Sequence, residues 1–157
     1  MFFFYFPHDH YFFWAQNLAQ GKLTVDNLPD TFPDIIRWEG HKYLPFGPLP
    51  ALVLIPFLPL LNAGLDLGWI SILATILNIW LLSRILRWMN ITGVTRKWLM
   101  ILFFGGTVYF SATLAPFSTW FAHLLVVSCT LLAIEETLGK RRPALIGLYV
   151  GLGSMIR

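Results

Sequence analysis

The chain has 157 residues, of which 57% are hydrophobic and 12% are charged, and its net charge is +3. Soluble domains carry roughly 25% charged residues, so this composition excludes an ordinary water-facing surface and predicts an all-α, polytopic membrane protein. The positive charge does not indicate a nucleic-acid partner, because the basic residues stand at the ends of apolar runs, where membrane proteins place them. The single cysteine, Cys129, excludes an intramolecular disulfide bond.

The N-terminal part of the chain contains its most polar segment. We expect residues 1–6, which are apolar and aromatic, to be the end of a spanning helix whose start is absent. Residues 7–47 then form an outer loop with a short juxtamembrane helix that ends at Gly21, and a turn at Gly40 between two extended pieces. Residues 48–61 contain four prolines and fall short of the about 20 residues that a spanning helix needs, so we expect an interfacial helix.

The rest of the chain alternates apolar runs with short basic connectors. A spanning helix needs about 20 residues, and three of the runs meet that length. Because the chain stops inside a further run, we expect it to be a fragment of a longer protein. The expected elements are three full spans and one partial span, at residues 65–88, 98–117, 119–138 and 144–157.

The basic connectors predict the orientation of the chain in the membrane. Both are expected in the cytoplasm by the positive-inside rule, and the two spans between them place them on the same side. The loop at 7–47 is then outside if 48–61 stays in the interface, and cytoplasmic if 48–61 crosses the bilayer. Short length and prolines favour the interfacial position. The basic residues are Arg84, Arg87, Arg96 and Lys97 in one connector and Lys140, Arg141 and Arg142 in the other.

Asp9 is the leading candidate for a catalytic residue. Its carboxylate follows an apolar, aromatic stretch, and such a group can act as a general base on a hydroxyl or bind a divalent cation. With His8 and His10 it resembles a loose metal cluster, which makes Asp9 and His10 candidate metal ligands and a divalent metal a candidate cofactor. The alternatives are that Asp9 caps the helix that follows it and that both histidines are solvated at the interface.

Cationic side chains provide candidate substrate-binding residues. Arg37, His41 and Lys42 flank the predicted turn and can pair with a phosphate at the membrane surface, and ordinary headgroup contact is the alternative. His123 stands at the outer end of the span 119–138. An ionisable residue within a span is a functional candidate, and the alternative is a side chain that only reaches toward the interface.

The order and spacing of these motifs resemble the polytopic C-type glycosyltransferases. These enzymes use lipid-phosphosugar donors, and they include the protein O-mannosyltransferases and the lipid A aminoarabinose transferase. The resemblance extends over nearly the whole chain. The matching segments are Asp9-x-Tyr11, Ala15-x-x-Leu18-x-x-Gly21-Lys22, Trp38-x-Gly40-x-x-Tyr43-x-Pro45-Phe46-x-Pro48-Leu49-Pro50, Ser83-Arg84-Ile85-Leu86-Arg87 and Trp120-Phe121-Ala122-His123.

The resemblance implies an inverting glycosyltransferase that moves a sugar from a polyprenyl-phosphate donor to an acceptor at the outer membrane face. It implies that Asp9 activates the acceptor or contacts a metal, and it adds Tyr11 and Tyr43 to the candidate substrate-binding residues. The expected partners are the lipid-linked donor and membrane lipid, in the inner membrane of a bacterial cell. Two alternatives stay open: a non-catalytic assembly subunit or decayed gene fragment, and a transporter piece, which the scarcity of charge within the spans disfavours.

Overall fold

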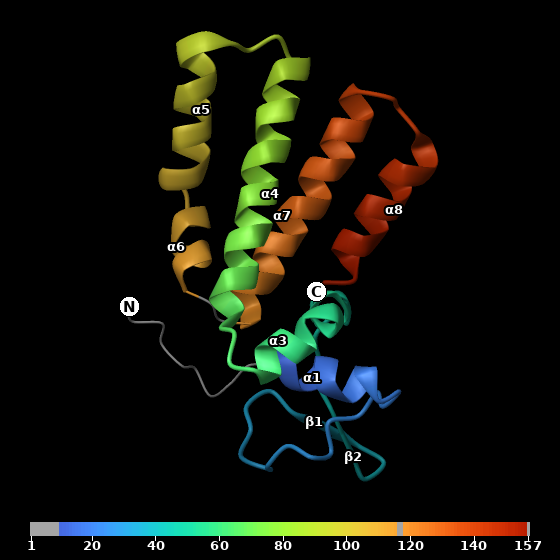
Figure 1. The fold of residues 1–157 in the computed structure, drawn as a ribbon. Coiled ribbons are helices and arrows are strands. Elements are labelled where there is room, and N and C mark those ends of the chain that lie inside the picture. Colours follow the sequence, from blue (N-terminus) through green and yellow to red (C-terminus); the bar gives the residue numbers. More distant parts are fainter. Residues whose placement is uncertain (1–9, 116–117, 157) are drawn as a thin grey trace.

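The computed structural model describes residues 10–115 and 118–156, and these are mostly helical (Figure 1). The expectation of a mainly helical chain is confirmed, apart from one small two-stranded sheet. In the described part, two helices are long and apolar enough to cross a membrane, Leu67–Trp88 and Thr119–Leu138. The expected end of a first span at 1–6, and Asp9 with His8, lie outside the described residues.

The long helices lie side by side in a bundle (Figure 1). Helix α4 contacts α5, α6 and α7, and α7 also contacts α6 and α8. The carboxylate of Asp66 accepts a hydrogen bond from the amide of Gly68 at 2.6 Å and thereby caps the start of α4. The bounds of these helices are α4 Leu67–Trp88, α5 Gly93–Gly105, α6 Tyr109–Leu114, α7 Ser118–Leu138 and α8 Pro143–Ser154.

The run expected as one span at 98–117 forms two helices instead. The helix starts earlier, at Gly93, and is interrupted at residues 106–108, which we call the α5–α6 break. Consecutive glycines, Gly105 and Gly106, stand at the start of the break, and glycine is a poor helix former. The hydroxyl of Thr107 donates to the Phe103 carbonyl at 2.7 Å and accepts from the Tyr109 amide at 3.2 Å, so it replaces part of the helical hydrogen bonding. Three uninterrupted spans are therefore not confirmed.

A buried polar side chain joins three helices inside the bundle. Asn78 of α4 is fully buried, and its Nδ2 donates to the hydroxyl of Tyr109 at 2.6 Å and to the carbonyl of Leu124 at 3.0 Å. Beside it, the hydroxyls of Thr75 and Thr113 lie 3.0 Å apart. Hydrogen bonds between helices hold apolar bundles together where burial against lipid gives little driving force. These contacts hold the short helix α6 against α4 and α7.

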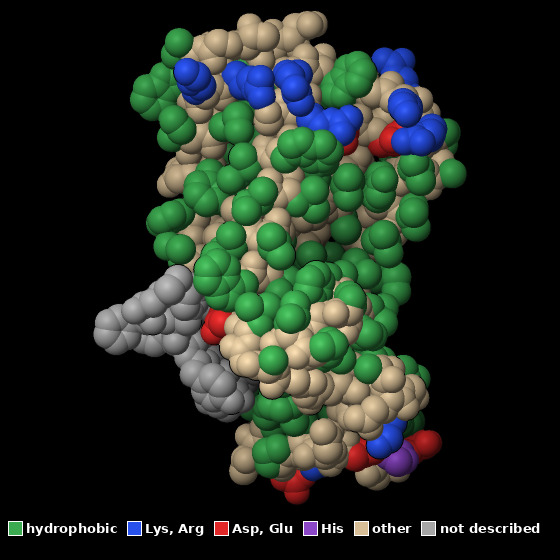
Figure 2. Space-filling model, in the orientation of Figure 1, with side chains coloured by type: hydrophobic (Ala, Val, Ile, Leu, Met, Phe, Trp, Pro, Cys, Tyr) green, Lys and Arg blue, Asp and Glu red, His purple; other side chains and the backbone are tan. Residues whose placement is uncertain are grey.

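Basic side chains gather at one end of the bundle, around the α4–α5 and α7–α8 connectors (Figure 2). Two acids near the end of α7 neutralise part of this charge: Arg84 pairs with Glu135 at 2.5 Å, and Arg142 pairs with Glu136 at 2.7 Å. The two connectors therefore lie at the same end, as expected, and residues 10–62 lie at the opposite end (Figure 1).

Residues 10–62 form a cap over the other end of the bundle (Figure 1). Its strands pair antiparallel, with Arg37 opposite Lys42, and residues Glu39 and Gly40 make the turn with φ of 49° and 82°. Two residues with positive φ fit the twist of a two-residue hairpin, so the expected turn at Gly40 is confirmed. The bounds in the cap are α1 His10–Ala19, β1 Ile36–Trp38, β2 His41–Tyr43, α2 Leu49–Leu54, a 3₁₀ turn η1 at Ile55–Phe57 and α3 Leu58–Asn62.

Prolines divide the segment expected as an interfacial helix at 48–61. Each of α2, η1 and α3 has a proline in its first turn, where the missing amide hydrogen does no harm. The three pieces pack against α1. At about 1.5 Å per residue, even an unbroken helix of this length falls short of the roughly 30 Å hydrocarbon core of a bilayer.

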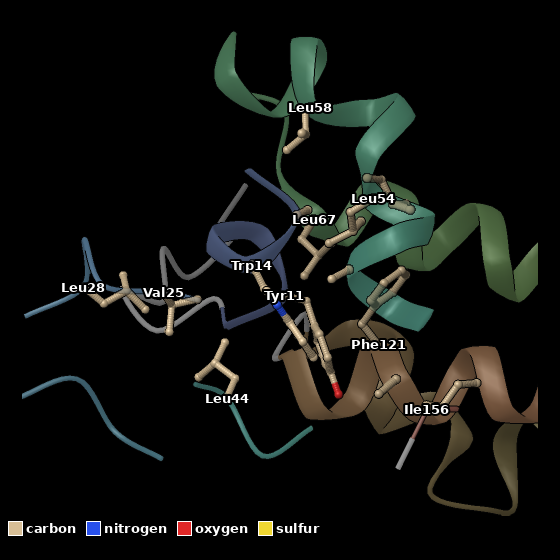
Figure 3. Packing of buried hydrophobic residues seen from close by; sticks show 14 of the residues in the cluster. Tyr11, Trp14, Val25, Leu28, Leu44, Leu54, Leu58, Leu67, Phe121 and Ile156 are labelled. Carbon is tan, nitrogen blue, oxygen red and sulfur yellow. The ribbon is translucent and has the colours of Figure 1, made fainter. Parts of the chain in front are cut away.

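The cap and the bundle share one hydrophobic core (Figure 3). Tyr11 and Trp14 of α1 pack with Leu44 and Leu54 against Phe121 of α7, which is fully buried. A second contact ties the cap to the end of α8. There the Leu49 amide donates to the Met155 carbonyl at 3.3 Å, and a Cβ placed on Gly47 would lie 2.1 Å from that same oxygen. The chain can approach so closely only because residue 47 is glycine.

Candidate functional site

Two aspartates organise the polar face of the hairpin. The carboxylate of Asp26 accepts hydrogen bonds from the Lys42 backbone amide at 2.7 Å, from the Thr24 hydroxyl at 2.8 Å and from the His41 ring at 3.0 Å. The backbone amide of Lys42, with help from His41 and Thr24, lowers the pKa of Asp26 to about 2. Asp26 is therefore ionised above about pH 2, and it fixes the start of strand β2.

Asp30 joins the other two cations of the hairpin. Its Oδ1 lies 3.0 Å from Lys42 Nζ and 3.0 Å from the Arg37 guanidinium. The Lys42 hydrogen bond, followed by that of Arg37, lowers the pKa of Asp30 below its ordinary value. Lys42 Nζ also donates to the Leu28 carbonyl. We call these five ionisable side chains, Asp26, Asp30, Arg37, His41 and Lys42, the hairpin cluster.

The hairpin cluster brings together the three basic side chains expected to bind phosphate, but it pairs them with carboxylates. A phosphate would have to displace Asp26 from His41, or Asp30 from Arg37 and Lys42. The hairpin also occupies the side of the cap away from the bundle (Figure 1). As folded, these cations hold the hairpin in register and are poorly placed to meet a lipid-linked phosphate.

Tyr11 lies in the core and Tyr43 in the hairpin. Tyr11 is only 3% exposed, its ring centroid lies 5.9 Å from that of Phe46, and burial raises its pKa to about 12. Its substrate-binding role, which the resemblance implies, would require the core to open. Tyr43 is half-buried and pairs with Ile36 across the sheet.

His10, the expected metal ligand, is held between aromatic rings. The Phe32 and Phe46 rings meet it edge-on at centroid distances of 5.0 and 5.2 Å. Its Nε2 lies 3.3 Å from the Pro33 carbonyl oxygen and 3.5 Å from Asp34 Oδ2. Among residues 10–115 and 118–156, no three His, Cys, Asp or Glu side chains form a group that could hold a metal ion. The other expected ligand, Asp9, falls outside those ranges.

His123 lies beside an apolar groove between the α5–α6 break and α7. The side chain is exposed, and its ring centroid lies 6.0 Å from that of Trp120. The groove has a volume of about 370 Å³. Thr107 and Tyr109 line it from the break, and Leu124 and Val127 line it from α7. Sequence reasoning missed Thr107 and Tyr109, although the consecutive glycines before them could have indicated the break.

Three segments that carry the motifs meet where the cap joins the bundle. Tyr11, Leu44 and Phe121 belong to three motif segments and lie in one core cluster (Figure 3). His123 follows Phe121 by two residues on α7, and because positions two apart on a helix do not share a face, its side chain points to the groove and away from this core cluster. No family model, curated protein or solved structure matches this chain.

Proposed function

We propose that this chain is a polytopic membrane glycosyltransferase, or part of one, that takes its sugar from a polyprenyl-phosphate donor at the outer face of a bacterial inner membrane. The observation that carries the proposal is the meeting of the motif segments at the junction of cap and bundle. The order and spacing of those segments resemble the C-type glycosyltransferases. A site at that junction would stand at headgroup depth, where the lipid tail of the donor holds its phosphate.

The charge distribution supports the proposed orientation. The positive-inside rule assigns the end with both basic connectors to the cytoplasm, which leaves the cap outside. Helices α4 and α7 then cross the membrane, and α5 and α6 together make a bent third crossing. A bend is tolerated at membrane depth where protein satisfies the freed backbone groups, as Thr107 does at the α5–α6 break.

The groove beside His123 suits the donor. Its walls are mainly apolar, which fits an isoprenoid tail, and an imidazole at its edge can donate a hydrogen bond to phosphate. We assign the phosphate contact to His123 in preference to Arg37, His41 and Lys42, because those three are paired within the hairpin cluster. Asp9 keeps the role of general base toward the acceptor hydroxyl, on the strength of the sequence.

Transfer from labelled donor tests the proposal. Membranes containing the full chain are incubated with radiolabelled polyprenyl-phosphate hexoses and pentoses, and transfer of label to membrane acceptors is measured. Asp9→Asn should lower transfer by about a hundred- to ten-thousand-fold, the range typical of a lost general base, while asparagine keeps the capping ability of aspartate. His123→Ala should raise the KM for donor with a smaller effect on kcat.

The control variant is Glu39→Gln. Asp30→Asn is unsuitable as a control because Asp30 bridges Arg37 and Lys42. Glu39 lies in the exposed hairpin turn, and glutamine preserves its size. Normal turnover in Asp9→Asn would reduce Asp9 to a helix cap, and absence of transfer from every donor in membranes that contain the full chain would remove the proposed activity.

A further inference from the structure

A pocket in the cap gathers most of the carboxamide side chains of the protein. It lies between the C-terminal ends of α1 and α3, and its volume is about 350 Å³, within the range of small-molecule sites. The sequence contains seven asparagines and glutamines, and five of them line this pocket. We call it the amide pocket; the five are Gln16, Asn17, Gln20, Asn27 and Asn62.

Hydrogen bonds within the amide pocket orient its side chains. Gln16 Nε2 donates to Asn62 Oδ1 at 3.0 Å and so links α1 to α3. Asn17, which is 5% exposed, donates through Nδ2 to Asn27 Oδ1 at 3.0 Å and to the Phe13 carbonyl at 3.2 Å. Each of these hydrogen bonds uses either the nitrogen or the oxygen of a side-chain amide, and leaves the other atom of that amide unused. Among the described residues, the Gln16 oxygen, the Asn27 and Asn62 nitrogens and the whole Gln20 amide remain available to a ligand.

The chemistry of the lining selects the class of ligand. Within residues 10–115 and 118–156, every polar side chain that lines the pocket is an uncharged amide, so these residues offer no counter-ion to a phosphate, a carboxylate or an ammonium group. A carboxamide presents donors and an acceptor from one planar group, and a sugar hydroxyl likewise both donates and accepts. Leu58 and Ala19 complete the lining and provide an apolar surface for the C–H face of a sugar ring.

We propose that the amide pocket binds a neutral sugar. The inference goes beyond the proposed transferase activity and does not depend on it, because the pocket contains none of the residues assigned to donor or acceptor chemistry. A neutral saccharide held there would tether a glycan to the outer cap. Binding can therefore be measured without donor, acceptor or turnover.

Saturation-transfer NMR on the full chain in lipid nanodiscs tests the proposal, with methyl α-glucoside and methyl α-mannoside as probes. At least one glycoside should bind saturably, and glucose 6-phosphate should bind more weakly because none of the described lining residues is a cation that could neutralise its phosphate. The double variant Gln20→Ala, Asn62→Ala should weaken glycoside binding by about tenfold, as expected for two lost hydrogen bonds between uncharged groups. Gln20 is exposed, so Gln20→Ala alone serves if the double variant does not fold.

The matched control is Asn90→Gly, which removes an amide at the opposite end of the bundle. Asn90 has φ of 58°, a conformation that glycine adopts without strain, so the variant should fold and bind glycoside normally. The proposal is overturned if no glycoside binds saturably, or if the variants in the pocket bind as well as Asn90→Gly. It is also overturned if N-acetylglycine methylamide, a neutral peptide mimic, binds more tightly than either glycoside.

Discussion

Replacing Gly47 with alanine should detach the cap from the end of α8. A Cβ at this position would lie 2.1 Å from the Met155 carbonyl oxygen, and 2.7 Å from the carbonyl carbon of Ile156. Non-bonded carbon atoms rest at roughly 3.5–4.0 Å, so the two backbones must separate by about 1 Å or more. The neighbouring atoms are backbone, and no side-chain rotation relieves the overlap.

The free-energy cost of Gly47→Ala follows from the contacts between the cap and the end of α8 that this separation breaks. Overpacking at a close-packed position costs about 1–3 kcal/mol, and loss of the hydrogen bond from the Leu49 amide to Met155 adds about 0.5–1.5 kcal/mol. The cap–α8 contact should therefore weaken by about 2–4 kcal/mol. Because 1.4 kcal/mol corresponds to a factor of ten, local opening should become about 30- to 700-fold more frequent. Ile156, now 4% exposed, would become accessible to solvent.

Hydrogen exchange followed by mass spectrometry measures this opening at residues 47–49 and 152–156. Exchange there should accelerate in Gly47→Ala, while the middle of α4 stays protected. Gly21→Ala controls for the replacement of a glycine that has no close neighbour. Its φ of 73° is strained for alanine, but no atom lies within 4 Å of the added Cβ. Unchanged exchange at Met155 and Ile156 in Gly47→Ala would refute the close approach of these segments.

Two further predictions concern orientation and pH. In a Cys129→Ser background, cysteines at Leu23 and Val94, both well exposed, should label from opposite sides of the membrane, and labelling from one side would reject the proposed topology. The pKa of Asp26 is lowered in the fold to about 2 from an ordinary 3.8, so its contribution to hairpin stability is complete above about pH 4. Protection of the Lys42 amide should therefore fall as the pH drops from about 4 to 2, and Asp26→Asn should weaken that dependence and leave the part due to Asp30.

The sequence predicts well those features that depend on neighbouring residues. The helix α1 ends at Ala19, and Gly21 follows with φ of 73°, as its place after an apolar helix suggested. The hairpin turn at Gly40 and the helix that starts after Asp66 are likewise local features. In each case a particular backbone conformation favours a particular residue type. The residue therefore predicts the local structure correctly.

Features that depend on tertiary contacts escaped prediction. The pairing of Asp30 with Lys42 follows from hairpin register and the path of residues 26–34, which no local pattern encodes. Burial of Tyr11 requires Phe121, more than a hundred residues away in the chain. The α5–α6 break was not predicted either, because the average hydropathy of residues 98–117 is high whether or not the helical backbone hydrogen bonds continue.

The α5–α6 break has a mechanical consequence. An unbroken helix moves as a rigid rod, so a displacement at one end is transmitted to the other end. Here the half formed by α5 and the half formed by α6 meet at a corner, and the buried amide of Asn78 holds only the α6 half. Motion of α5 near the basic connectors should therefore be absorbed at residues 106–108. Tyr109, which α6 contributes to the groove beside His123, would keep its place against Asn78 while α5 moves.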